Sequence, residues 1–192
     1  MKNFARAIAA FLLAAGFAAS AQGAKKAEAV AKLIGLDGKE MGNAHFQATS
    51  HGVLIEITLQ GLKPGGHAVM IHTTASCDPK TKFTSAGPDL SFQPEKLHGF
   101  LAKGGPRPGD LPSQFAGADG VLHAATITNA VSLGNSKKSI FDRDGASIIV
   151  NAKPDDYISQ PDGNAGPRIA CGTIIRTIGP GARKAGTRRT HR

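Results

Sequence analysis

GVLIEITLQGLKPGGHAVMIH, residues 52–72, has the pattern of two β-strands joined by a turn. Apolar and polar residues alternate over 53–59, which is typical of a strand with one buried face. LKPGG supplies the proline and glycines of a turn, and HAVMIHT, residues 67–73, forms the next apolar segment. Upstream, residues 44–50 form another strand-like segment before a Ser-His-Gly turn. The centre of the chain therefore predicts antiparallel β-structure.

The rest of the chain continues this pattern, with interruptions. Further strands are predicted within GADGVLHAATITNAVSL (117–133), ASIIVNAK (146–153) and IACGTIIRTI (169–178). Two long segments rich in Gly, Pro and Asp, residues 74–117 and 154–168, show no periodicity. Loops of this length in a compact domain are usually functional or disordered. Because no amphipathic helix is evident, the sequence favours an all-β sandwich or barrel.

The N-terminus has the features of a secretory signal peptide, which we place at residues 1–23. MKNFAR carries two basic residues, and AIAAFLLAAGFAA is an apolar run followed by small residues. That run is shorter than the roughly 20 residues that a membrane-spanning helix needs. We therefore expect a periplasmic or secreted protein. The two cysteines, Cys77 and Cys171, then predict one disulfide bond.

Positive charge is concentrated at the C-terminus. The formal net charge is +9, of which the tail 179–192, GPGARKAGTRRTHR, contributes five basic residues and no acid. Lys2 and Arg6 lie in the signal-like segment, so the body of the chain is close to neutral. A short, charged, Gly-containing tail buries nothing, and we expect it to be disordered. Its expected partner is an anionic surface of the cell envelope, and no nucleic acid is expected.

One segment near the C-terminus resembles a known family. GNAGPRIACGTI, residues 163–174, matches the C-terminal signature of Cu/Zn superoxide dismutases at every position. The opening stretch, RPGDLPSQFAGADGV (107–121) and IIVNAKPDDYISQP (148–161) are similar to the bacterial branch. The resemblance identifies residues 24–178 as a dismutase-like domain. It implies an eight-stranded Greek-key β-barrel with two long loops, and a disulfide that ties Cys77 to Cys171, and it leaves the oligomeric state open.

The copper ligands implied by the resemblance are mostly replaced. The family places copper on four histidines, two of them in a His-x-His pair that is Met70-Ile71-His72 here. The histidine that bridges copper to zinc should fall in GPDLSFQP, where the local match gives Ser91 and a shifted spacing gives Leu90. The fourth position is Asn151. Only His72 remains as an imidazole, with Met70 beside it as a thioether.

The zinc ligands implied by the resemblance are also incomplete. His98 and Asp110 match two of them, but Arg107 stands where another histidine belongs. A guanidinium is always charged, so Arg107 should repel Zn²⁺ and pair with Asp110. We therefore expect an Arg107–Asp110 ion pair that holds the long loop closed.

Two supporting residues of the family are retained. Asp155 matches the aspartate that orients ligands of both metals, and Arg168 matches the arginine that guides superoxide toward copper. Both residues also have a structural interpretation, because Asp155 can hydrogen-bond its loop and Arg168 can pair with a loop carbonyl. In that interpretation Arg168 is a vestigial superoxide guide.

Three functions remain open. The first is an exported dismutase-like protein with little or no dismutase activity, which binds neither copper nor zinc tightly. The second is a periplasmic Cu(I)-binding protein that uses Met70 and His72, since a soft thioether favours Cu(I). The third is an active superoxide dismutase with other copper ligands, such as His67, Asp89 or His123. The loss of three copper imidazoles favours the first.

Overall fold

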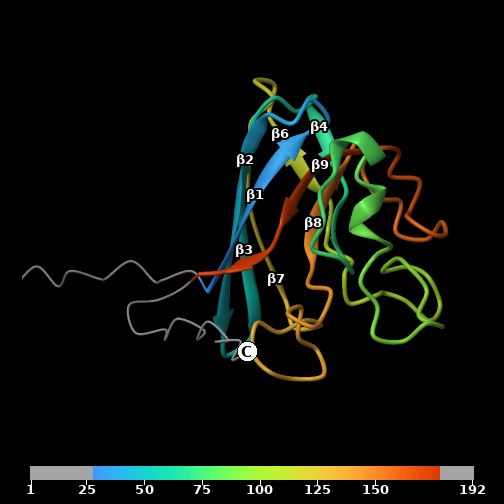
Figure 1. Ribbon diagram of the computed structural model, residues 1–192. Helices are drawn as coiled ribbons and strands as arrows, with labels where there is room; N and C mark the ends of the chain where they lie inside the picture. Colours follow the sequence, from blue (N-terminus) through green and yellow to red (C-terminus); the bar gives the residue numbers. More distant parts are fainter. Residues whose placement is uncertain (1–27, 178–192) are drawn as a thin grey trace, which may run out of the picture.

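The computed structural model describes residues 28–177, which form β-structure with two short 3₁₀ turns and no α-helix (Figure 1). The predicted all-β class is confirmed. The elements are β1 (Ala29–Gly35), β2 (Glu40–Thr49), β3 (Gly52–Leu59), β4 (Gly65–His67), β5 (Val69–His72), η1 (Pro79–Thr81), η2 (Thr84–Ala86), β6 (Gln114–Ala116), β7 (Leu122–Thr128), β8 (Ser147–Asn151), β9 (Arg168–Thr173) and β10 (Ile175–Arg176). Three strands depart from the predicted set: β1, upstream of the first predicted strand; β6, inside the predicted loop 74–117; and β4, which begins in the predicted turn LKPGG.

Eight strands form one curled sheet in the order β5-β8-β9-β1-β2-β3-β7, with β10 also paired to β1. Neighbours such as β9 and β1, or β3 and β7, are far apart in the sequence. The connections between them cross over, as in a Greek key. Among the described residues, β5 and β7 are the two edges of the sheet, so the predicted barrel is observed as a half-barrel. β4 and β6 form a separate two-stranded ladder.

The inward-facing side chains of the sheet form the main hydrophobic core. Buried and more exposed positions alternate along β1 and β3, because successive side chains on a strand point to opposite faces. Leu33, Phe46, Ile55 and Ile57 are fully buried in this core. The alternation on β3 is the pattern that the sequence showed over 53–59.

β5 and β8 differ from this pattern, because every residue on both strands is buried. One face of each strand packs on the core, and the segments 73–113 and 152–167 cover the other face. Figure 1 shows these two long loops on the same side of the sheet, next to β8 and β9. Polar side chains on the outer face of β5 are therefore enclosed under the loops.

The first long loop also covers the free edge of β5. The Leu90 amide donates to the Ile71 carbonyl at 2.8 Å, and the Ile71 amide donates to the Gly109 carbonyl at 2.8 Å. The Gly109 amide donates to the Leu90 carbonyl at 3.0 Å. A side chain on Gly109 would collide with the Ile71 carbonyl oxygen, so only glycine fits there. This short ladder fixes Asp89 and Asp110 beside β5.

The predicted disulfide is confirmed. Cys77 in the first long loop is bonded to Cys171 on β9, with 5.6 Å between their Cα atoms. The bond spans 94 residues of sequence and holds the loop against the sheet.

Two sequence predictions lie outside the described residues. They are the signal peptide at 1–23 and the disordered basic tail at 179–192. Within 28–177, no helix has the length and apolar character that crossing a membrane requires.

Candidate metal centre

β5 presents Met70 and His72 on its outer face, while Val69 and Ile71 belong to the main core. The side chain of Met70 is buried against Ala68 and Ala165 in a small apolar cluster of its own. His72 is also buried, with 2 % of its surface exposed. The shared face follows from the two-residue period of a strand.

One ring nitrogen of His72 lacks a hydrogen-bond partner among residues 28–177. Its Nδ1 lies 2.9 Å from the Gly87 carbonyl oxygen, which only accepts, so Nδ1 carries the hydrogen. Nε2 has no hydrogen-bond partner in the described part of the chain and lies 3.1 Å from Asp89 Oδ1. Burial lowers the pKa of His72 despite the nearby carboxylate. A neutral His72 thus directs a lone pair at Asp89, an arrangement that a proton or another cation between the two atoms would stabilise.

Asp89 is the residue between His72 and the rest of the cluster. Its Oδ2 lies 3.4 Å from His98 Nδ1 and 3.3 Å from a terminal nitrogen of Arg107. Burial raises the pKa of Asp89, but the His98 hydrogen bond and the charges of neighbouring cations, among them His98 and Arg107, outweigh burial, so the pKa is lowered overall. Asp89 is therefore an ionised, buried carboxylate that contacts both halves of the site.

The two residues expected at the bridging position lie elsewhere. The Ser91 hydroxyl donates to the Gln93 carbonyl within the loop, and Leu90 belongs to the main core. The bridging place is taken by Asp89, in the sequence Gly-Pro-Asp. The signal in the sequence was the acidic residue directly after Gly87-Pro88, which was predicted only as an alternative copper ligand.

His98 is held between carboxylates on both sides. Nδ1 lies 2.9 Å from Asp110 Oδ1, and Nε2 lies 3.1 Å from Asp155 Oδ1. Burial alone would lower the pKa of His98, but the hydrogen bonds to Asp110, Asp89 and Asp155 raise it to about 10. His98 is therefore an imidazolium at neutral pH, with both ring nitrogens donating.

Arg107 does not form the expected ion pair with Asp110. Its guanidinium contacts Asp89 Oδ2 and also donates to the carbonyls of Lys96 at 3.0 Å and Pro161 at 3.1 Å. Asp110 Oδ2 instead accepts the backbone amides of Gly99 at 2.7 Å and Arg107 at 2.9 Å. Because Arg107 is only three residues before Asp110, its backbone is the part that reaches that carboxylate.

Asn151 lies at the end of β8, in the position expected for the fourth copper ligand. Its amide nitrogen donates to the Gly166 carbonyl at 2.9 Å. Its Oδ1 is buried and has no hydrogen-bond partner among residues 28–177. The side chain thus joins β8 to the second long loop.

The two retained supporting residues both contact loop backbone. Arg168 donates to the carbonyls of Phe83 at 2.7 Å and Gly87 at 2.9 Å. Asp155 Oδ1 accepts from the Tyr157 amide at 2.6 Å as well as from His98, and burial raises the pKa of Asp155. Both contacts agree with the structural interpretation of these residues.

The three alternative copper ligands, His67, Asp89 and His123, lie in different parts of the structure. Both ring nitrogens of His67 lie 2.8 Å from carbonyl oxygens, those of Asn151 and Lys63. His123 is exposed on β7 and its Nδ1 lies 3.2 Å from the Thr58 hydroxyl. Of the three alternatives, only Asp89 lies in the cluster.

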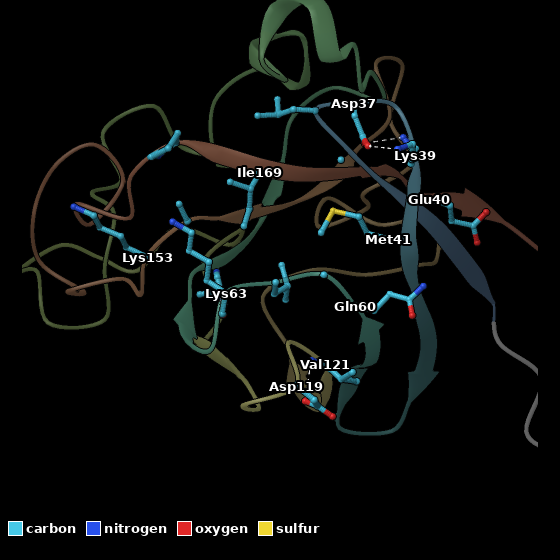
Figure 2. A pocket seen from close by; sticks show the side chains of 17 residues that line it. Asp37, Lys39, Glu40, Met41, Gln60, Lys63, Asp119, Val121, Lys153 and Ile169 are labelled. Carbon is cyan, nitrogen blue, oxygen red and sulfur yellow. Dashed lines mark hydrogen bonds and ion pairs between the residues drawn. The ribbon is translucent and has the colours of Figure 1, made fainter.

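One groove in the described part of the chain is separate from this cluster (Figure 2). It has a volume of about 1140 Å³ and lies between the β1–β2 turn, the β3–β4 connection and the chain after β8. Figure 2 shows Lys63 and Lys153 on one side of it and the Asp37–Lys39 pair on another. None of His72, Asp89 and His98 lines this groove, so it is not an entrance to the cluster.

Most of the described chain matches a single protein-family model. Residues 40–174 match the family model described as copper/zinc superoxide dismutase (SODC). The chain belongs to the copper/zinc superoxide dismutase family. The sequence resemblance assigns His72 to the copper side of the superoxide dismutase centre, and His98 with Asp110 to its zinc side, and we keep these names for the two sides.

Similar members of the superoxide dismutase family include enzymes and a dismutase-like protein. A superoxide dismutase [Cu-Zn] of Caulobacter vibrioides is 41% identical over 140 residues, which cover 72% of this chain and 80% of the relative. The superoxide dismutase-like protein YojM of Bacillus subtilis is 35% identical over 148 residues, covering 75% and 74%. A crystal structure of a SOD-like protein from Bacillus subtilis superposes with a TM-score of 0.72 at 34% identity, covering 76% of this chain and 97% of that one.

The residues on the copper side do not fit the four-imidazole site of the superoxide dismutase family. His72 Nε2 is a suitable metal ligand, because it is buried and none of the described residues hydrogen-bonds to it. Met70 packs against alanines, and the Asn151 amide nitrogen is used by the loop. Imidazoles suit both copper oxidation states, whereas a thioether favours only Cu(I).

The residues on the zinc side do not fit zinc either. Asp89, His98 and Asp110 could each offer one ligand atom, and these atoms lie within 4.8 Å of one another. However, both nitrogens of His98 are engaged by aspartates, and the fourth position carries the charged side chain of Arg107. Zinc sites of structural type almost always have four protein ligands.

Proposed function

We propose that this chain is an exported superoxide dismutase-like protein with little or no dismutase activity. Family membership supports the fold and the ancestry of the site, and the relatives include enzymes as well as a dismutase-like protein. The observation that carries the proposal is the donor set around His72, which contains one imidazole where the family uses four. Export is proposed from the signal-like N-terminus and agrees with the disulfide between Cys77 and Cys171.

The chemistry of the cluster explains why activity should be lost. Dismutation requires a copper ion that stays bound while it is alternately reduced and oxidised. The residues of this chain provide His72 Nε2, a nearby carboxylate from Asp89, and a guanidinium next to that carboxylate. These groups can bind a proton and form ion pairs, but they do not offer Cu(II) four nitrogen ligands in a square-planar arrangement. The buried cluster therefore acts as an anchor for the two long loops.

Dismutase activity of the copper-loaded protein tests this proposal. Copper is added to the purified, disulfide-bonded chain, loosely bound copper is removed with a chelator, and superoxide decay is measured. We expect no rate above that of the chelated copper control. A chelator-resistant rate similar to that of a family enzyme measured in parallel would contradict the proposal and favour non-standard copper ligation.

A variant with restored ligands provides the positive control. Met70→His, Asp89→His and Asn151→His in one chain would bring four imidazoles to the copper side together with His72. We expect this variant to retain Cu(II) against the chelator, which can be followed by its copper content and visible absorption. A variant that carries these three changes together with His72→Gln should not retain Cu(II) against the chelator.

A second candidate is a Cu(I)-binding protein, which Met70 and His72 support. Both are buried on one face of β5, and Nε2 of His72 has no hydrogen-bond partner in the described residues. Cu(I) tolerates low coordination by thioether and imidazole. Titration under anaerobic, reducing conditions against a Cu(I) chelator tests this function. Met70→Leu should lower the Cu(I) affinity if Met70 is a ligand, whereas unchanged affinity would exclude it.

A further inference from the structure

Three buried aspartates surround His98 on the zinc side of the fold. Asp89, Asp110 and Asp155 have 6 %, 4 % and 5 % of their surfaces exposed. Removing several carboxylates from water is costly unless cations and hydrogen bonds compensate them closely. His98 contacts all three of these carboxylates, but one imidazole ring cannot balance three of them. The cluster therefore requires a second positive charge.

Arg107 supplies that charge, and its position is fixed by several contacts. The guanidinium donates to Asp89 Oδ2, to the Lys96 carbonyl and to the Pro161 carbonyl. Its side chain is mostly buried, with 19 % exposed. These acceptors lie in both long loops, so one side chain joins segment 73–113 to segment 152–167. In addition, the Arg107 backbone amide donates to Asp110.

The same contacts exclude a divalent cation. An ion held by Asp89, His98 and Asp110 would need the Asp89 oxygen that faces His98 at 3.4 Å. That oxygen already accepts from Arg107 at 3.3 Å. A divalent ion at this place would lie next to a guanidinium that does not lose its proton, and like charges at such a distance in a partly buried site repel strongly.

We propose that Arg107 is the built-in cation of this site, which replaces the divalent ion, closes both long loops without metal and keeps zinc out. This inference concerns the zinc side alone and goes beyond the proposed function, because it does not depend on whether copper binds or superoxide reacts. It predicts that the folded protein needs no metal, and that removing the guanidinium creates a metal site from residues already present.

Arg107→His tests the inference as a gain of metal binding. The variant places a fourth donor beside Asp89, His98 and Asp110, as the family pattern has it. Arg143→His is the matched control, because Arg143 is exposed outside this cluster and the change in charge and ligand type is the same. Both variants and the unmodified chain are purified with their disulfide intact, treated with EDTA, and titrated with Zn²⁺ and with Co²⁺ as a spectroscopic probe.

We expect the unmodified chain and Arg143→His to show no change in melting temperature with EDTA or Zn²⁺. Arg107→His should melt at a higher temperature with Zn²⁺, bind it at least about tenfold more tightly than the control, and give the visible absorption of tetrahedral Co²⁺. Stoichiometric zinc in the unmodified chain, or a drop in its melting temperature with EDTA, would overturn the inference.

Arg107→Gln covers the case in which the histidine variant does not fold. It removes the charge, keeps a hydrogen-bonding side chain and retains Asp89, His98 and Asp110. Limited proteolysis should cut segment 73–113 faster in Arg107→Gln than in the unmodified chain, and Zn²⁺ should slow that cleavage. If neither variant responds to Zn²⁺ more than the unmodified chain does, Arg107 is not what excludes the metal.

Discussion

Asp89 connects the two halves of the buried cluster, because its two oxygens face different partners. Oδ1 lies against His72, while Oδ2 lies near both His98 and Arg107. His98 also contacts two other aspartates, whereas Arg107 contacts no other carboxylate among residues 28–177. Removing the charge of Asp89 thus leaves one guanidinium poorly compensated in a partly buried place.

Asp89→Asn should therefore destabilise the protein, although the side chain keeps its size. We expect a loss of roughly 3 kcal/mol in the free energy of unfolding, which is typical when one partner of a buried ion pair is removed. Asp37→Asn is the control, because Asp37 is 58% exposed in its pair with Lys39 and an exposed ion pair contributes little to stability. Chemical denaturation measures both, and equal losses would contradict the role assigned to Asp89.

His98 should make the stability of the protein depend on alkaline pH. The pKa of His98 is about 10 in the folded protein and 6.5 as an ordinary histidine, so the folded state binds the proton more tightly. Its contribution is complete below pH 6.5 and is lost as the pH rises toward about 10. We expect the free energy of unfolding to fall across this range in the unmodified chain, and to fall less in His98→Gln. Parallel curves would show that His98 is not the titrating group.

At the level of elements, the first long loop is held to the sheet by a covalent bond and by hydrogen bonds. Cys77 is bonded to Cys171 on β9, and Arg168 at the start of β9 donates to Phe83 and Gly87 of the same loop. Gly87 also accepts from His72 on β5. The orientation of His72 thus depends on a loop that the disulfide fixes.

Breaking this disulfide should cost much of the stability. Closing 94 residues in the unfolded chain corresponds to about 4–5 kcal/mol in the chain-entropy model, which we take as an upper value. Cys77→Ser with Cys171→Ser should therefore unfold at a clearly lower denaturant concentration than the oxidised chain. Adding a reductant to the double variant should have no further effect. Identical midpoints for the oxidised chain and the double variant would contradict this expectation.

The strands were predictable where one face of the sheet is buried and the other exposed. β3 shows this alternation in its sequence, and it was found at the expected residues. β6 was missed because three residues carry no periodic signal, and its partner β4 is far away in sequence. β1 was missed although its burial alternates, because AVAKLIG follows AKKAE (24–28), a segment of similar Ala- and Lys-containing composition.

The site was predictable as a set of residues but not as a set of contacts. His72, His98 and Asp110 were chosen by resemblance to a family motif, and the structure brings them into one cluster. Within a long loop, however, spacing does not determine which residue reaches the sheet. The pairing of Leu90 with Ile71 sets that register, which places Asp89 rather than Ser91 beside His72.

At the level of the whole molecule, we propose that the basic tail, residues 179–192, attaches the protein to anionic surfaces. The tail lies outside the described residues, and its five basic side chains are known from the sequence. Attraction to an anionic surface is about 1 kcal/mol per basic residue near that surface. It weakens with salt, because the Debye length falls to roughly 3 Å at 1 M.

Vesicles that contain anionic lipid should therefore bind the protein at low salt and release it at high salt. Deleting residues 181–192 should abolish binding while the far-ultraviolet circular dichroism spectrum stays that of the folded β-domain. Co-sedimentation with anionic and neutral vesicles measures both effects. Binding that persists at high salt, or after the deletion, would show that other residues attach the protein to the vesicle.

The short ladder between the first long loop and β5 has a consequence for self-association. β5 is an edge of the sheet, and Leu90 and Gly109 occupy backbone groups of Ile71 that would otherwise be open to another chain. Asp89 and Asp110 are the sequence neighbours of Leu90 and Gly109. The ionic cluster therefore also keeps this part of the loop in place over the apolar edge strand β5. Exposed edges of this kind are templates for intermolecular strand pairing. Disruption of the ionic cluster should therefore cause aggregation before the hydrophobic core unfolds.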